Sequence, residues 1–462
     1  MKNIGLEARR EEILKGPILK TLIKLASPSI GIYAFSSMYY LMDTIWLGGL
    51  GSSSVSAPTF TWPIINTLFS LVLGISMASV ALVTQYRGAK MDDEARYSIG
   101  QTFIVASIIS IPLVIVFLYI LPLISNFFGL EGSFREDFIN YAQLVVFSDI
   151  AYGFAYISSI VIRNWGYPEI SFLVAFPYVL LNVILDPLLI YGFFGFPAMG
   201  VKGAALATLI SQSLQTFTSL YVMRSEKYIG LKLHHFKPRK DLIKKLIKVG
   251  TPLSGSNAIT ASGFFVLTAI ISRIGPYAIT AWTIYNRVSE IGTWFAYALN
   301  DAATTMTGQS IGNNNFERAK KVAKLNVTVN FIVILITSIL IAIFSKELFG
   351  FFLRNPEDPY RDVVVFEESV LISWTFGMSI PFFILSVSAL TPFTASGNTK
   401  YNLLVAIMRL WGLRVPLSYI FGISLEMGSL GAWVGMAISN VIAGLLAYIL
   451  MMKNLWVMRV IE

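Results

Sequence analysis

The stretch "KLASP" at residues 24–28 resembles "KVGTP" at residues 248–252, far along the same chain. Lysine and proline keep their places in both copies, and the offset from Lys24 to Lys248 links five more identical pairs. These pairs are Gly51 with Gly275, Ala57 with Ala281, Gln85 with Gln309, Gly88 with Gly312, and Ala95 with Ala319. A later echo, "GVKGAA" at 200–205 and "GSLGAW" at 428–433, has a slightly different offset. Together the matches predict a tandem repeat.

The composition indicates a membrane protein. Of the 462 residues, 55% are hydrophobic and only 13% are charged, which is too apolar for a soluble chain of this length. Apolar runs of about 20 residues, the length of a membrane-spanning helix, recur from end to end. They predict spans at roughly 23–47, 58–82, 98–122, 138–162, 170–192, 201–223, 249–272, 280–307, 324–345, 365–390, 402–423 and 428–451. We therefore expect an all-α integral membrane protein with twelve transmembrane helices in two pseudo-symmetric six-helix bundles.

The largest polar break lies at mid-chain. It predicts an N-terminal six-helix lobe (1–224), a cytoplasmic linker (225–247) and a C-terminal six-helix lobe (248–462). Of the 35 lysines and arginines, 26 fall on one side of the predicted spans, six on the other and three inside spans. Because positive residues favour the cytoplasm, we expect both termini there, in a multi-pass protein of the cell (inner) membrane. Two six-span halves share one orientation, which is typical of transporters with a central cavity.

Five motifs follow one another along nearly the whole chain. They are Asp43 with "GGLGSSSVSA", "VTQYRGAKMDDEA", "IRNWGYPEIS", "LNVILDPLLIYG" and "TGQSIGNNNFERA". In their order and spacing they resemble the multidrug and toxic compound extrusion (MATE) family, with its prokaryotic DNA-damage-inducible-F-like branch as one candidate subgroup. The resemblance implies a secondary multidrug efflux antiporter, not an enzyme. Such a protein exports organic cations or amphiphilic drugs by alternating access, in exchange for H⁺ or Na⁺, and needs no cofactor.

Acidic residues within the predicted spans are candidate functional groups, because an ionised carboxylate costs several kcal/mol in hydrocarbon. The first span runs outward, so Asp43 lies about 28 Å beyond Lys24 at 1.5 Å per residue, in the outer half of the bilayer. Asp186, near the end of the fifth span, lies at a similar depth, and Asn182 shares its helical face. The position equivalent to Asp43 in the second repeat is Leu267. The chemistry is therefore expected in the N-terminal lobe alone.

Two coupling mechanisms fit this cluster, and the sequence does not choose between them. In the first, Asp43 and Asp186 bind and release H⁺ as buried, mutually repelling carboxylates. In the second, Na⁺ is the bound metal ion, held by Asp43, Asp186, the amide oxygen of Asn182 and the hydroxyl of Thr208. Hard cations prefer such oxygen ligands.

The substrate cavity is predicted to be lined at the same depth by Tyr39, Tyr40, Tyr141 and Asp149. Aromatic rings and a carboxylate suit amphiphilic cations. Pro28 removes a helical hydrogen bond and predicts a kink in the first span. The kink is either static or bends when Asp43 changes state.

Structural roles stay open for the three acids. Asp43 can cap its helix at the outer interface, and Asp186 can be a turn residue before Pro187. Asp149 matches no motif that we can place and fits a hydrogen-bonded structural acid.

Two further groups of polar residues have simpler interpretations. Arg287 and Glu290, three residues apart in the eighth span, are expected to form an internal ion pair. Asp301, deeper in that span, fits either a structural or a coupling role. The two histidines, His234 and His235, lie in a lysine-rich stretch without other obvious ligands and are expected to be solvated.

Two other functions fit parts of the sequence. A lipid-linked saccharide flippase of the same superfamily would share the helix layout, but acids in the N-terminal half favour a cationic substrate over an anionic phosphate. A prenyltransferase-like enzyme would need a second aspartate-rich motif facing "NVILD". The expected partners are small-molecule organic cations or drugs and membrane lipids, with no nucleic acid and no second subunit, so that the protein acts as a monomer.

Overall fold

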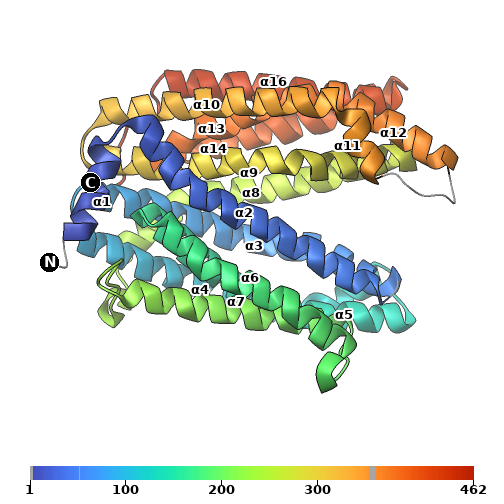
Figure 1. The fold of residues 1–462 in the computed structure, drawn as a ribbon, viewed down its shortest axis with the longest axis horizontal. Coiled ribbons are helices and arrows are strands. Elements are labelled where there is room, and N and C mark those ends of the chain that lie inside the picture. Colours follow the sequence, from blue (N-terminus) through green and yellow to red (C-terminus); the bar gives the residue numbers. More distant parts are fainter. Residues whose placement is uncertain (1–3, 51, 353–358, 462) are drawn as a thin grey trace.

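The computed structural model describes residues 4–50, 52–352 and 359–461, and every regular element in these ranges is helical (Figure 1). The first half contains α1 (Ile4–Lys15), α2 (Ile18–Gly48), α3 (Ser52–Gly88), α4 (Asp92–Phe127), α5 (Gly132–Trp165), α6 (Pro168–Tyr191) and α7 (Val201–Arg224). The second half contains α8 (Lys240–Ile274), α9 (Pro276–Gly312), α10 (Phe316–Ile343), α11 (Ser345–Phe352), α12 (Pro359–Trp374), α13 (Ile380–Ser396), α14 (Lys400–Ile407), α15 (Val415–Tyr419) and α16 (Gly428–Met452). The twelve predicted spans correspond to these helices, and the all-α fold is confirmed.

Two of the predicted spans are not regular α-helices. The tenth is α12 followed by α13, separated by the 3₁₀ turn η3 (Gly377–Ser379). Pro381 at the start of α13 has no N–H to continue the hydrogen-bond ladder from α12. The eleventh runs from α14 to α15 through a π-helical turn, η4 (Met408–Arg414), and ends in a second one, η5 (Ile420–Ser424).

The helices extend further than the apolar runs predicted. For example, α9 covers Pro276–Gly312 where the sequence predicted 280–307. In the described part of the chain, ten helical segments are both long and apolar enough to cross a membrane. The other two long helices, α7 and α9, are less apolar because small and polar residues occupy their buried faces. Hydropathy alone therefore underestimates the number of membrane-spanning helices, because it misses those that contact mainly protein.

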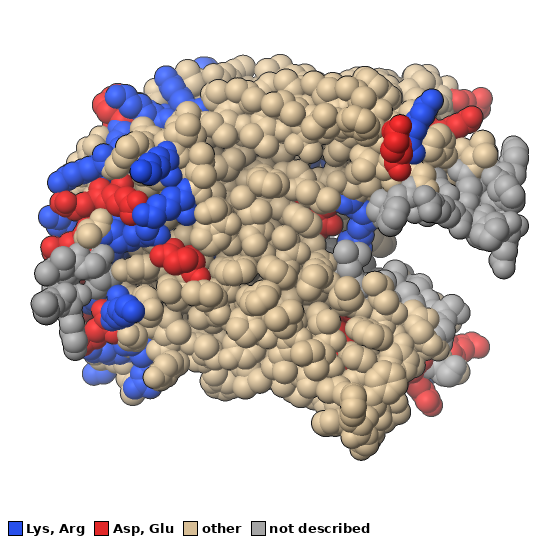
Figure 2. Space-filling model, in the orientation of Figure 1, with Lys and Arg blue, Asp and Glu red and all other residues tan. Residues whose placement is uncertain are grey.

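The helices form two groups, which we call the N-lobe (α2–α7) and the C-lobe (α8–α16). Figure 1 shows the two lobes side by side at the end of the molecule that carries both termini and diverging toward the opposite end. Lysine and arginine side chains gather at the end with the termini, here called the basic end, whereas the opposite end is hollowed between the lobes (Figure 2). An apolar cluster joins the lobes near the basic end: it includes Leu22 and Leu25 of α2 with Ala302 and Met306 of α9.

The contacts at the basic end repeat with the predicted symmetry. The side-chain amide of Gln85 in α3 donates to the carbonyl of Ala395 in the C-lobe, at 2.8 Å. Gln309 is the counterpart of Gln85 in the second repeat. Its side-chain amide donates to the carbonyl of Asn164 in the N-lobe, at 3.4 Å. The turns that follow contain left-handed residues at the same offset, Lys90 with φ 62° and Asn314 with φ 58°. The two repeats therefore face each other across a pseudo-two-fold axis.

Candidate functional site

The predicted acids Asp43 and Asp186 lie on neighbouring helices, α2 and α6, within electrostatic range of each other. Gly166, with φ 116°, caps α5, and Pro168 then begins α6, because its fixed φ suits a first helical turn. α6 therefore returns beside α5 toward the hollowed end. Asp186 is 0% exposed, and among the described residues neither carboxylate oxygen has a hydrogen-bond partner.

Asn182 lies one turn before Asp186 on the same helix and is 1% exposed. Within the described ranges, neither its amide oxygen nor its amide nitrogen has a hydrogen-bond partner. Pro187 has no N–H, so the carbonyl of Val183, next to Asn182, also lacks its helical donor. Buried polar atoms are normally paired, so this concentration of unpaired oxygen atoms marks a place where a proton or a cation would be stabilised.

Tyr39 connects this acidic pair to two other helices. Its hydroxyl forms a 2.8 Å hydrogen bond with the hydroxyl of Thr208 in α7. It also lies within electrostatic range of Asp43, Asp186 and Tyr141, the last of which belongs to α5. The structure thus brings together most of the residues that the sequence selected. The side chain of Tyr40 lies outside the described residues.

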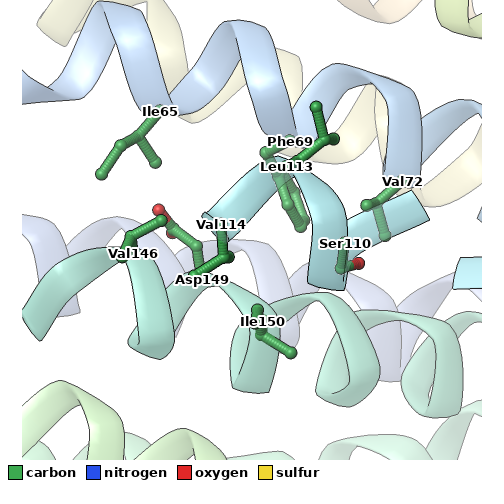
Figure 3. A pocket seen from close by; sticks show the side chains of 9 residues that line it. All are labelled: Ile65, Phe69, Val72, Ser110, Leu113, Val114, Val146, Asp149 and Ile150. Carbon is green, nitrogen blue, oxygen red and sulfur yellow. The ribbon is translucent and has the colours of Figure 1, made fainter. Parts of the chain in front are cut away.

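Asp149 lies apart from this group, although the sequence placed it in the same layer. Its carboxylate faces a small pocket between α3, α4 and α5 (Figure 3), with about 360 Å³ of empty space, open solvent included. The pocket is lined by Ile65, Phe69, Val72, Ser110, Leu113, Val114, Val146 and Ile150. Oδ2 of Asp149 has no hydrogen-bond partner in the described part of the chain. The carboxylate is therefore held in largely apolar surroundings, without the bonds of a structural acid at that atom.

Pro28 lies within α2, which remains one helix from Ile18 to Gly48. Its ring is half-buried, and the helix carries Asp43 four turns further on. The kink at Pro28 and its role in transport stay predictions.

The Arg287–Glu290 ion pair is present at 3.7 Å, but it is not internal as predicted. The two side chains are 50% and 35% exposed. Glu290 also accepts a 2.6 Å hydrogen bond from the hydroxyl of Ser37 in α2. The same hydroxyl accepts a hydrogen bond from the indole N–H of Trp294. The pair therefore lies at the junction of the two lobes, where water reaches it.

Asp301 takes part in a contact between the lobes that the sequence did not predict. Its Oδ2 lies 3.3 Å from Nε of Arg163 and accepts a 2.9 Å hydrogen bond from Tyr33. Arg163 follows directly after the predicted span 138–162, and its side chain is only 5% exposed. The side chain of Asn164 likewise accepts a hydrogen bond from Thr305 of α9. These contacts hold α2 and α5 of the N-lobe against α9.

The prediction of solvated histidines is wrong for His235, which is 1% exposed. Its Nδ1 accepts from the backbone N–H of Lys232 and its Nε2 lies 3.0 Å from Asp93. Ligand atoms of Asp93, His234 and His235 all lie within 4.8 Å of one another. Because the protein already uses both ring nitrogens of His235, this cluster fastens the linker to α4 and is a poor metal site. Burial lowers the pKa of His235, against the opposing effect of Asp93.

The MatE family model matches residues 28–188 and again residues 252–420. The two segments begin at the repeated prolines, Pro28 and Pro252, and cover more than half of the chain. The chain belongs to the MATE family. It is therefore a multi-pass membrane transporter of small molecules and not an enzyme, and members of the family are cation-coupled antiporters.

Relatives of this MATE transporter match it over almost their full length. An uncharacterized transporter, YisQ, of Bacillus subtilis is 25% identical over 96% of this chain and 97% of its own. A probable multidrug resistance protein, NorM, of Thermotoga maritima is 23% identical over 96% and 94%. A solved MOP superfamily transporter from Pyrococcus furiosus, described as having a binding pocket of reverse polarity that suggests a different function, has a TM-score of 0.88. It is 22% identical, covers 96% of this chain and 97% of its own, and shows that the fold is shared.

Proposed function

We propose that this MATE transporter exports organic cations or amphiphilic drugs in exchange for H⁺ or Na⁺, by alternating access between its two lobes. The observation that carries the proposal is the cluster of buried, unpaired polar atoms on Asp186 and Asn182, with Asp43 in electrostatic range. Two carboxylates within electrostatic range repel each other when both are ionised. Binding of a proton or a cation removes that repulsion, so the site responds to an ion gradient.

The ion site and the substrate site are proposed to be neighbours within the N-lobe. The pocket around Asp149 combines one carboxylate with apolar walls and the ring of Phe69. A carboxylate in an apolar wall favours a positively charged group attached to an apolar body. Tyr39 and Tyr141 are proposed to line the route between the two sites, since both lie on the helices that carry them.

The lobes 1–224 and 248–462 are proposed to be the moving units, joined by the linker 225–247. The basic end, with both termini, is proposed to face the cytoplasm of a cell (inner) membrane. The chain contains no cysteine, so single cysteines introduced at Lys15 and Lys202 report on the two sides. A membrane-impermeant maleimide added to intact cells should label the cysteine at Lys202 and leave that at Lys15 unlabelled.

The function is tested with purified protein in liposomes, to which a pH gradient and a Na⁺ gradient are applied separately. One of the two gradients should drive uptake of rhodamine 123, a lipophilic cation. Asp43→Asn and Asp186→Asn should abolish the driven uptake, because each removes an ionisable group of the site. Glu131→Gln, which changes an exposed acid, should transport as the wild type does.

Three results would reject parts of this proposal. Undiminished driven uptake by Asp43→Asn would remove Asp43 from the coupling site. Uptake that ignores both gradients would reject antiport. Gradient-independent transfer of a lipid-linked saccharide between leaflets would instead support the flippase alternative.

A further inference from the structure

Two arginines lie deep inside the C-lobe, on the π-helical turn η4 of the eleventh span. Arg409 is 7% exposed and Arg414 is 2% exposed. Turns of π-helix are rare and occur frequently at functional sites, because the wider turn redirects side chains. Both residues belong to the three basic residues that fall inside predicted spans, so both charges require an explanation.

Neither arginine forms an ion pair with a carboxylate of the described residues. Arg414 donates to the side-chain oxygen of Asn440 and, at 3.1 Å, to the hydroxyl of Ser439. Asn440 in turn donates to Ser379 at 2.9 Å. Arg414 is thus held by neutral groups, which orient the guanidinium and leave its charge uncompensated.

Arg409 has fewer partners still. Its Nη1 is buried without a hydrogen-bond partner in the part of the chain that the structure describes. Its guanidinium lies over the ring of Phe383, 4.8 Å from the ring centroid. A buried, unpaired charge within the membrane is costly, and the donors of a guanidinium match the oxygens of a carboxylate. The arrangement is therefore one that an anionic group would stabilise.

The two lobes carry opposite charges at equivalent places. Pro187 in the fifth span and Pro416 in the eleventh both lie near the end of the fifth helix of their repeat. Asp186 directly precedes the first proline, and Arg414 lies two residues before the second. The interior of the N-lobe is therefore acidic where the interior of the C-lobe is basic.

Arg409 lies directly behind the interface between the lobes. It is within electrostatic range of Tyr297 in α9. The ring of Tyr297 faces that of Tyr33 in α2, with 6.0 Å between centroids. Phe383 and Tyr297 therefore offer ring surfaces beside the charge of Arg409.

We propose that Arg409, positioned together with Arg414, is an anion-binding site that takes the carboxylate of an aromatic substrate. The inference deepens the proposed function, on which it rests, because it extends the substrates from cations to amphoteric molecules. A substrate that carries both charges would meet acids in one lobe and arginines in the other.

The test uses two dyes that differ in one group. Rhodamine 110 carries a free carboxylate, and rhodamine 123 is its methyl ester. Binding of each to the full chain in lipid nanodiscs is followed by fluorescence anisotropy. Arg409→Gln should weaken binding of the acid by about tenfold or more, because a charge-assisted hydrogen bond is lost. Binding of the ester should change by less than about twofold, because the ester carries no negative charge for the guanidinium to pair with.

Two more variants separate recognition from folding. Arg409→Lys keeps the charge but not the fork of donors, so acid binding should recover in part. Arg273→Gln changes an exposed arginine of the same lobe and should leave both dyes unaffected. If Arg409→Gln does not fold, the ratio of acid to ester affinity in Arg409→Lys decides, since it should fall below that of the wild type.

The anion site would be overturned if Arg409→Gln weakened binding of the acid and the ester equally, or did not weaken binding of the acid. Gradient-driven uptake of the ester by wild-type liposomes tests the proposed function separately. Loss of that uptake with intact acid selectivity would reject the antiport and leave the anion site standing. Normal uptake of the ester without acid selectivity would reject the anion site and leave the antiport standing.

Discussion

Gly88 at the end of α3 packs directly against the backbone of Gln309 in α9: a Cβ atom on Gly88 would lie 2.0 Å from the Gln309 carbonyl oxygen. The repeat reproduces this contact, because a Cβ on Gly312 would lie 2.0 Å from the carbonyl oxygen of Gln85. The two glutamines also bond across to the opposite lobe. The four residues form a symmetric closure at the basic end, which only glycine at both positions permits.

We predict that Gly88→Ala opens this closure. A methyl group cannot fit against backbone on both sides, and overpacking of this kind costs about 1–3 kcal/mol. The ratio of separated to closed molecules should therefore rise by about five- to 150-fold. Spin labels on cysteines introduced at Met91 and Glu317, which are exposed on opposite lobes, measure the change by pulsed electron resonance as a new population at longer distance.

Gly350→Ala is the matched control, because a Cβ there meets nothing within 4 Å. It should leave the distance distribution unchanged. An unchanged distribution in Gly88→Ala as well would show that the closure tolerates a side chain and is not the gate.

We predict that Arg163 and Asp301 stabilise the same closure through their ion pair. Each belongs to a different lobe, and removal of one leaves the other buried or half-buried without its partner. Arg163→Gln and Asp301→Asn should each lower the thermal unfolding midpoint. The double variant should lose less than the sum, with a coupling energy of about 0.5–3 kcal/mol. Strict additivity would mean that the two residues act independently.

The sequence predicted what depends on distance along a helix and missed what depends on rotation about its axis. A rise of about 1.5 Å for each helical residue placed Asp43, Asp186 and Asn182 at one level. These three do lie on neighbouring helices. The same estimate of depth placed Asp149 at this level too, but its carboxylate faces a separate pocket. Depth alone carries no information about which neighbour a helical face contacts.

The missed contacts have a similar cause. Arg163 falls just outside the predicted span 138–162, yet the end of α5 is buried against α9. His235 looked solvated because lysines surround it in sequence, whereas the fold brings Asp93 from α4 to it. Arg409 and Arg414 gave a usable signal, since arginines within an apolar run are as unusual as the aspartates that we singled out.

We predict that Asn182→Ala identifies the coupling ion. If Na⁺ is bound, the variant loses an oxygen ligand worth about 1.5–3 kcal/mol. The Na⁺ concentration at half-maximal uptake should then rise by about 10- to 150-fold. If H⁺ is the ion, the amide is not titrated, and the pH dependence of uptake should stay that of the wild type. Initial rates over a series of Na⁺ concentrations and pH values distinguish the two cases. A variant with an altered pH dependence and an unaltered Na⁺ dependence would contradict both cases.

We predict that acid loosens the linker from α4 through His235. The neutral ring accepts from Lys232 and bonds to Asp93, and a proton on Nδ1 would remove the acceptor. Because burial lowers the pKa of His235 in the folded protein, its stabilising effect is complete above the unfolded pKa of about 6.5 and is lost as the pH falls through the lowered value. Hydrogen exchange of residues 225–239, corrected for its intrinsic pH dependence, should be faster at about pH 5 than at pH 7.5. Arg96 also holds the linker, because its side chain donates to the carbonyl of Ile229. His234→Gln, at the exposed neighbour, should retain the response, and His235→Gln should lose it. A response that persists in His235→Gln would assign the effect to another group.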